Sequence, residues 1–437
     1  MKCLQRAQGL TNIYIGLMLG LFPLFWGTDG YNRITEGKFW FFVSVTGVWL
    51  LGCAGLLLWG LLRGETYNPQ PRAVHWAVML YLAWGAVSAL LSPYGGACLL
   101  GCGRYDGYLI TVLLALVFFG VSALGQPRRW HLYALALSAA LCALVCLAQR
   151  TGANLFGLYP DGTNYFDKYI RFSAAFIGTL GNAGITAAFL CLAAPALAVL
   201  GLRGREKGDF LFLIAAALSL GALYACDVQA AWVALLGCVA LAAVLLPAQR
   251  RVRRVAAVVV TALAAAGVIA VYFWPGESGT VWELSRLLHG ELREEFGSHR
   301  GQIWAACLRL VRERPLLGGG PGTLASRLDI VWSRFIEQTQ SETTVYVDNA
   351  HNVYLGILVN TGLPSLAAYL AALGCSAARF VKNRRSPLAA ALGLGIAGYA
   401  IQDFFGLGLV LSSPLLWVTW GLLESRALAP PAGEAVV

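Results

Sequence analysis

Apolar residues follow one another along this chain in runs of about twenty, separated by short polar or charged segments. A helix of that length spans the hydrocarbon core of a bilayer, which is roughly 30 Å thick. The fold class that follows is an all-α polytopic membrane protein. The pattern predicts about twelve membrane-spanning helices, at residues 9–26, 39–62, 74–92, 107–124, 130–148, 183–202, 209–225, 229–247, 255–274, 363–381, 387–403 and 407–423.

Composition supports this reading and excludes soluble enzymes, fibres and disordered scaffolds. Hydrophobic residues make up 58% of the 437 residues and charged residues only 12%, against about 25% charged in soluble proteins. Most of the eleven cysteines lie within apolar runs, where they behave as small apolar residues. Cys98 and Cys102 fall near one membrane face, and the sequence leaves two alternatives for them, a disulfide or two free thiols.

The basic residues are distributed unevenly between the segments that join the apolar runs. If the N-terminus is cytoplasmic, 18 of the 32 lysines and arginines lie in cytoplasmic segments. The short outer loops hold 6, and the other 8 lie in one long outer segment that the positive-inside rule does not count. The asymmetry predicts that both termini are cytoplasmic. It also explains the formal net charge of +10 without a nucleic-acid partner. The six outer-loop residues are Arg33, Lys38, Arg104, Arg150, Lys168 and Arg171.

Two outer segments are longer and more polar than a connection between helices requires, and long loops tend to carry function. One covers about 150–182, and the other covers 275–362. The second mixes acidic residues with eight arginines, so we expect a small folded cap with helical segments. The chain then divides into spans 1 to 9 (1–274, including the outer loop at about 150–182), the large extracytoplasmic loop (275–362), and spans 10 to 12 with a short cytoplasmic tail (363–437).

Three of the five histidines fall outside under this topology, namely His289, His299 and His351. His351 stands in the sequence DNAHNVYL, where the long loop meets an apolar stretch. If that stretch is helical, His351, Tyr354 and Leu358 share one face, which places an imidazole at the membrane surface. The alternative is an interfacial histidine that is satisfied by a backbone carbonyl.

A second candidate begins at Ser298, which can act as the N-cap of a helix with Arg300 in its first turn. Pro315 ends the apolar pattern, and the glycine-rich sequence LLGGGPG follows at 316–322. This sequence lacks the Lys and Ser/Thr of a phosphate-binding P-loop, so it predicts a tight turn. A solvated loop cation is the alternative interpretation of Arg300. The apolar positions at helical spacing are Ile303, Trp304, Cys307, Leu308 and Val311.

Two further arginines lie near the outer ends of predicted spans. Arg171 precedes the apolar sequence FSAAFIGTLGN, and an arginine that enters the bilayer costs a few kcal/mol, so such residues usually face a cavity or a polar ligand. Snorkelling to the surface is the alternative for Arg171. Arg104 is a weaker candidate, because an ion pair with Asp106 is the simpler interpretation. The outer face carries no Asp-x-Asp pair and the chain no zinc-type Cys and His pattern, so we expect no metal and no cofactor.

The order of these pieces resembles the O-antigen ligase family. The resemblance rests on Arg300 and Trp304, on the sequence PLLG at 315–318, and on His351-Asn352 followed by Tyr354-Leu355 and Gly362. The Arg171 to Asn182 segment is similar to the family's earlier arginine before a Gly-Thr-x-Gly-Asn-like stretch. The similarity covers roughly 170–375. One departure stands at Asn360-Thr361, where many members have an acidic residue before the glycine.

The resemblance implies a metal-independent, inverting enzyme of the bacterial plasma membrane. It would transfer a glycan from undecaprenyl diphosphate to a hydroxyl of a glycan or lipid acceptor at the outer face. Arg171 and Arg300, with Arg104 in reserve, are the expected ligands of the diphosphate, because arginine binds phosphate bidentately. His351 is the expected general base, oriented by Asp348 or Asn352, with Tyr354 and Trp304 as supporting residues. The alternatives are a polymerase of surface polysaccharide repeat units, or a lipid-glycan flippase or transporter.

Overall fold

The computed structural model describes residues 2–159, 176–291, 296–336 and 341–428. Each predicted span overlaps a helix, although the last one (407–423) is helical only from Ser413, and eight helical segments are long and apolar enough to cross a membrane. Three more apolar helices, α5, α9 and α15, are shorter. The helices of the bundle are α1 (Lys2–Gly16), α2 (Ile34–Leu62), α3 (Ala73–Leu90), α5 (Tyr108–Leu124), α6 (Arg129–Arg150), α7 (Ala183–Arg203), α8 (Phe210–Cys226), α9 (Gln229–Leu245), α10 (Arg250–Tyr272), α13 (Val353–Asn383), α14 (Pro387–Asp403) and α15 (Ser413–Leu423).

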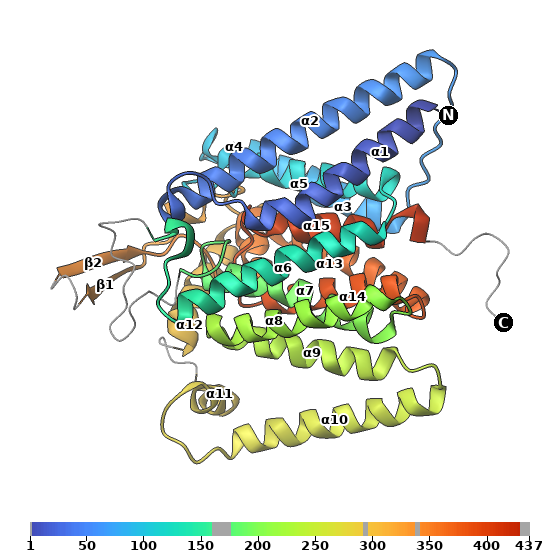
Figure 1. Ribbon diagram of the computed structural model, residues 1–437. Helices are drawn as coiled ribbons and strands as arrows, with labels where there is room; N and C mark the ends of the chain where they lie inside the picture. The colour runs from blue at the N-terminus through green and yellow to red at the C-terminus, as the bar shows by residue number, and fades with distance from the viewer. Residues whose placement is uncertain (1, 160–175, 292–295, 337–340, 429–437) are drawn as a thin grey trace.

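The long helices run side by side, and their connections gather at two ends of a bundle (Figure 1). One end, the hairpin end, carries helices α11 (Thr280–Leu288) and α12 (Phe296–Glu313) and strands β1 (Val331–Ile336) and β2 (Ser341–Tyr346). The opposite end holds the start of α1 and the end of α15. The chain is therefore a multi-pass membrane protein. Helix α1 begins on the side of the bundle on which α15 ends.

Small residues let the central helices approach closely. Helix α7 is the most buried of the candidate spans, and α14 packs along it. A Cβ added at Gly395 would lie 2.6 Å from the Leu192 carbonyl oxygen, and one at Gly398 would lie 2.2 Å from the Cys191 carbonyl oxygen. Because lipid gives no hydrophobic drive between helices, contacts at this spacing supply much of their association.

Lys38 corrects the assignment of the outer-loop charges. We counted it with the short outer loops, but it lies fully buried within α2. Its Nζ donates to the carbonyl oxygens of Phe22 (2.8 Å) and Pro23 (3.3 Å). Both carbonyls lie where α1 gives way to a π-helical turn (Leu17–Leu21) and a 3₁₀ turn (Phe22–Leu24) that contains Pro23, and the Phe22 carbonyl also accepts the Phe25 N–H.

The long loop contains a β-hairpin that we did not predict, in addition to the expected helical segments α11 and α12. Strands β1 and β2 pair antiparallel, with Val331 opposite Tyr346 and Ile336 opposite Ser341. The strand sequences VWSRFI and SETTVY are rich in β-branched and aromatic residues, which favour a pleated surface. The absence of a helical period in this stretch is the sequence signal for it.

The glycine-rich turn after Pro315 docks against a break in α13. Gly362 has φ +81°, and a Cβ there would lie 2.0 Å from the Leu316 carbonyl oxygen. The Gly319 and Gly320 amides donate to the Val359 and Asn360 carbonyls, which the break leaves free. The tight turn is confirmed. Helix α13 begins at Val353, ten residues before the predicted span at 363, so one helix carries the end of the loop into the bundle.

Candidate active site

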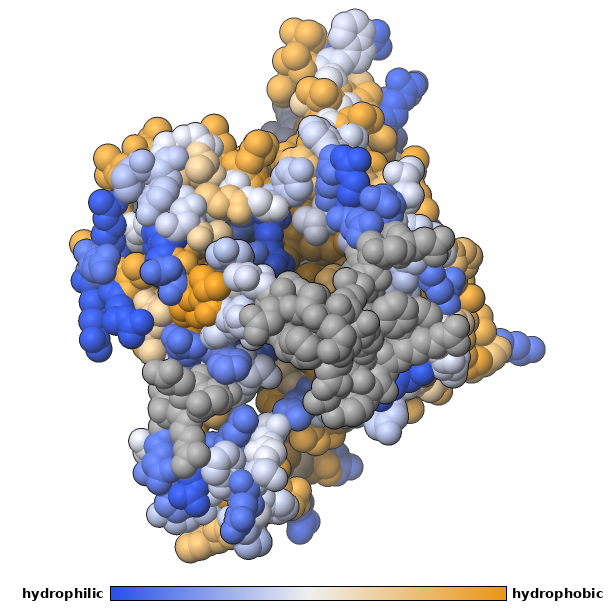
Figure 2. Space-filling model, turned by 90° about the vertical axis from the view of Figure 1, so that its left-hand side faces the viewer, coloured by the Kyte–Doolittle hydropathy of each residue, from blue (hydrophilic) through white to orange (hydrophobic). Residues whose placement is uncertain are grey.

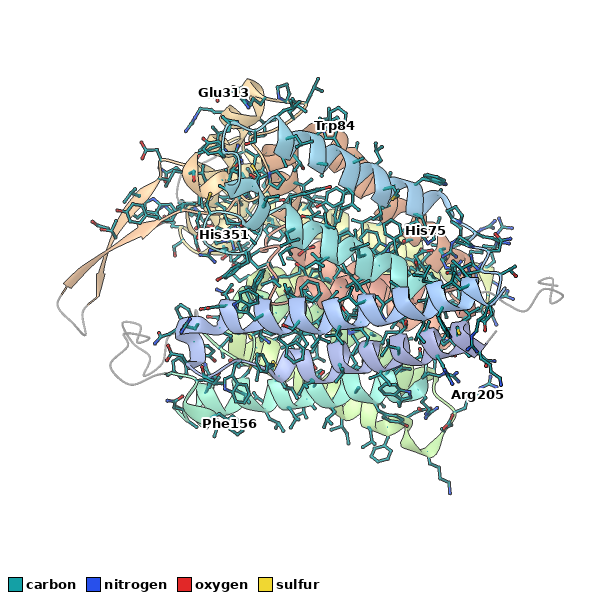
Figure 3. The ribbon with its side chains drawn as sticks, turned by 90° about the horizontal axis from the view of Figure 1, so that it is seen from above. His75, Trp84, Phe156, Arg205, Glu313 and His351 are labelled. Atoms are coloured by element: carbon teal, nitrogen blue, oxygen red, sulfur yellow. The ribbon has the colours of Figure 1, made fainter. Side chains whose placement is uncertain are left out.

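His351 lies at the hairpin end, in the connection between β2 and α13 (Figure 3). Its backbone has a left-handed conformation, with φ +48°, and its backbone N–H donates to Asn349 Oδ1 at 3.1 Å. The next residue, Asn352, is buried and caps α13 by accepting the Leu355 N–H at 3.0 Å. His351 therefore precedes the helix and does not lie on the helical face of Tyr354 that its spacing predicts.

Two aromatic residues fix the backbone around His351. The Trp304 indole Nε1 donates to the Ala350 carbonyl at 3.0 Å, which ties α12 to the residue before the histidine. The Tyr354 hydroxyl donates to the Ala400 carbonyl at 2.6 Å, which ties α13 to α14. Both rings lie against Phe404, at centroid distances of 5.8 Å and 6.5 Å. The supporting roles assigned to Trp304, Tyr354 and Asn352 are thus contacts that position the loop.

Arg300 is a half-buried cation with few partners. Gly297, Ser298 and His299 all have positive φ, from 60° to 67°, so the regular part of α12 begins at Arg300. Ser298 does not have the extended conformation of the N-cap that we expected. The Arg300 guanidinium donates to the Gly297 carbonyl (2.7 Å) and the Phe405 carbonyl (3.4 Å), while its buried Nε has no partner among the described residues. It forms no ion pair within the described chain, and burial lowers its pKa.

The sequence suggested that Arg104 pairs with its neighbour Asp106, but in the structure it pairs with Asp348. The Arg104 Nε donates to Asp348 Oδ2, joining the loop before α5 to the loop before α13 across 244 residues of sequence. Asp348 therefore orients Arg104, and the described residues offer the His351 ring no hydrogen-bond partner. Asp106 is half-buried, and burial raises its pKa.

The charges around His351 act on its titration. Burial is the largest effect, and the positive charges of Arg300 and Arg104 add to it, while Asp348 opposes them; together they lower the pKa of His351 to about 4. The imidazole is therefore neutral at pH 7 and able to accept a proton. Two arginines that were far apart in sequence thus lie within electrostatic range of one neutral histidine.

A cavity of about 130 Å³ extends into the bundle beside His351. Asn349 and Val353, on either side of the histidine, line it together with Asp106 and Asp403. Asp403, at the end of α14, is 2% exposed, and its Oδ1 has no partner among the described residues. The cavity therefore joins the histidine loop to one buried carboxyl group, Asp403, and one half-buried carboxyl group, Asp106.

Residues 214–370 match the family model described as O-antigen ligase. These residues belong to the O-antigen ligase family. The match contains Arg300, Trp304 and His351, so it covers the loop that carries the candidate site. No curated protein matches the chain. The chain is thus a multi-pass membrane protein, and the match of residues 214–370 to an O-antigen ligase or polymerase-like family supports an enzyme.

The hairpin end of this O-antigen ligase domain is polar on its surface. Figure 2 looks onto this end and shows hydrophilic side chains gathered over it, with apolar side chains between them. Arg171, expected to bind the diphosphate, lies outside the described residues. Cys98 and Cys102 are free thiols. No group of three His, Cys, Asp or Glu side chains among the described residues lies close enough to hold a metal ion.

Sequence reasoning on the O-antigen ligase motifs missed Asp403. Asp403 lies at the end of an apolar run, in the sequence AIQDFF. Placing a carboxylate near the membrane interior costs free energy, so such residues usually have a function. That cost was the available signal. Arg327 was missed too: it donates to the Asn360 side-chain oxygen and to the Val359 carbonyl, so it contacts the Asn360-Thr361 pair that precedes Gly362.

Proposed function

We propose that this protein transfers a glycan from undecaprenyl diphosphate to an acceptor hydroxyl at the outer face of the bacterial plasma membrane. The observation that carries the proposal is the juxtaposition of His351 with Arg300 and Arg104. The two guanidinium groups face only one carboxylate, so they can stabilise an anionic leaving group. The neutral imidazole can accept the proton that the acceptor hydroxyl loses.

The arginines would bind the diphosphate. Arg300 has no carboxylate partner in the described chain, and its Nε is buried without a hydrogen bond, so a phosphate oxygen supplies what the protein leaves open. Arg104 is half exposed and already shares charge with Asp348, which makes it the weaker ligand. Arg171 is the third proposed ligand, from the loop at about 150–182.

His351 would act as general base. The acceptor oxygen forms a bond to the anomeric carbon while the bond from that carbon to the phosphate oxygen breaks, with inversion. The acceptor proton passes to His351, and undecaprenyl diphosphate leaves with the bonding electron pair. Because the donor is anionic, its binding offsets the charges of Arg300 and Arg104 that lower the pKa of His351. The histidine then becomes a stronger base only when the donor is in place.

The two carboxyl groups of the cavity would help to bind the acceptor. Asp106 and Asp403 line the cavity beside the histidine loop, and burial raises the pKa of Asp106. A carboxylate oxygen accepts hydrogen bonds, which suits the hydroxyls of a sugar. In this proposal the hairpin end faces outward and both termini are cytoplasmic, as the arginine asymmetry predicts.

Transfer by purified protein in liposomes tests the proposal. The donor is a glycan linked to undecaprenyl diphosphate, and the readouts are release of undecaprenyl diphosphate and the mass and anomeric configuration of the product. One transfer to a separate lipid or glycan acceptor supports a ligase. A ladder of products from the donor alone supports the polymerase alternative. Movement of the donor across the bilayer without release of undecaprenyl diphosphate would contradict the enzyme and favour a flippase.

A further inference from the structure

A second and larger cavity, of about 990 Å³, lies at the opposite end of the bundle. Figure 3 shows His75, one of its lining residues, far from His351. Trp76 and Met79 line the cavity and are 63% and 49% exposed, so it opens on the side of the bundle that faces the bilayer. Its apolar walls come from three helices: Leu50, Ala54 and Leu57 of α2, Trp76 and Met79 of α3, and Leu116 and Phe119 of α5.

The mouth of this cavity is basic. Arg72, Arg379 and Arg426 line it. Glu424 lies 3.0 Å from Arg72 and 3.5 Å from Arg379 and is shared by both. Arg426 is exposed, donates only to the Asn68 carbonyl at 3.0 Å, and pairs with no carboxylate in the described part of the chain. Three guanidinium groups thus face one carboxylate, and two positive charges stay uncompensated.

We propose that this cavity binds an anionic phospholipid. Its acyl chains would lie along α2, α3 and α5, and its phosphate would meet Arg72 and Arg426 at the mouth. The site is independent of the proposed glycan transfer, because it lies at the other end of the bundle. Basic pockets between membrane helices bind lipid headgroups by this combination of charge and apolar surface.

The shape and polarity of the cavity favour a lipid over a free anion. A phosphate ion would meet the arginines but leave most of the apolar wall without contact, whereas acyl chains cover it. A lipid would also link α2 to α3 on either side of the 63–72 connection, of which Tyr67, Pro69, Gln70 and Pro71 line the cavity.

Lipid binding to the delipidated full-length protein, measured by native mass spectrometry, tests the headgroup contact. The probes are dioleoyl phosphatidylglycerol and dioleoyl phosphatidylcholine, which share acyl chains and differ in net charge. We expect phosphatidylglycerol to bind about 10-fold more tightly and Arg426→Gln to remove most of this difference. Arg251→Gln is the matched control, because Arg251 is exposed on α10 and lies outside the cavity. Arg72 and Arg379 are left intact because they hold Glu424.

A second pair of variants tests the apolar wall. Ala54→Phe fills the cavity and should weaken the binding of both lipids, whereas Ala265→Phe on the exposed helix α10 should not. Unchanged melting temperatures confirm that the variants fold. Equal affinity of the wild type for the two lipids would overturn the proposal. So would a preference for phosphatidylglycerol that survives Arg426→Gln, or displacement of the lipid by inorganic phosphate at the same concentration, which would indicate a simple anion site.

Discussion

The Trp304 indole donates a hydrogen bond to the carbonyl of Ala350 at 3.0 Å, and this contact places α12 directly beside the residue that precedes His351. Arg300 lies one turn earlier on the same helix. The hydrogen bond from Trp304 to Ala350 therefore sets the distance between Arg300, the proposed phosphate ligand, and His351, the proposed base. Arg300 and His351 themselves take no part in this hydrogen bond.

Trp304→Phe tests this positioning role. Phenylalanine keeps the aromatic contact with Phe404 but loses the N–H that holds Ala350, and a hydrogen bond of this kind contributes about 1 kcal/mol. We expect kcat to fall about 5-fold to 10-fold at similar donor KM. Steady-state transfer kinetics measure the split. Trp332→Phe is the control, because its indole donates to Gln302 and not to the histidine loop. An effect confined to the melting temperature would assign Trp304 a structural role only.

Replacing His351 tests the general base. His351→Ala removes the base but also places a residue that disfavours positive φ at +48°, so His351→Asn is the better variant, since asparagine tolerates this conformation. Transfer should fall by about 10²–10⁴-fold in both. His289→Ala should leave the rate near normal, because that ring stacks on Tyr272 and is bonded to the Ser285 carbonyl. Near-normal turnover of His351→Asn would refute the assignment.

The pH profile should report the shifted histidine. A base must be unprotonated, so the rate falls as pH drops through its pKa. The sequence alone predicts this limb in the ordinary histidine range, but the pKa of His351 is lowered to about 4. The kcat/KM of the free enzyme should therefore stay level from pH 8 to about 5 and fall near 4. The limb in kcat should lie at higher pH, because the bound diphosphate offsets Arg300 and Arg104. A kcat/KM limb at pH 6 to 7 that disappears in His351→Asn would contradict the shift.

Arg300→Lys tests the phosphate contact. Lysine keeps the charge but loses the planar fork that meets two oxygens, so we expect kcat/KM to fall about 10-fold to 100-fold. Arg309→Lys, at an exposed position of α12, is the matched control and should have no effect. Purified wild-type protein should keep its activity in EDTA. Loss of activity that magnesium or manganese restores would show that a metal, and not the arginines alone, neutralises the diphosphate.

The positions of the helices could be predicted from the sequence because the bilayer constrains the length and polarity of a membrane-spanning segment. Because a bilayer demands apolar runs of one length, the helices were placed from pattern alone, and the order of Arg300, Trp304 and His351 indicated the loop of the site. The partner of Arg104 could not be found in this way. Asp106 is two residues away and Asp348 is 244 residues away, and only packing decides between them. Lys38 is similar, because its buried ammonium group depends on carbonyls in an irregular turn of another helix.

The orientation of the bundle is the prediction on which the site's location depends. The arginine asymmetry places residues 300 and 351 outside and residues 251 and 385 inside, and the structure puts the first pair at the hairpin end and Arg385, between α13 and α14, at the opposite one. Single cysteines at these positions, in a background without the eleven native cysteines, should react with a membrane-impermeant thiol reagent in intact cells only at 300 and 351. Positions 300 and 351 are both half-buried, so we expect slow labelling there. An exposed cysteine at position 309, on α12 with position 300, serves as the positive control. Labelling at 251 or 385 but not at 309 would invert the topology and place the histidine and its arginines on the cytoplasmic side.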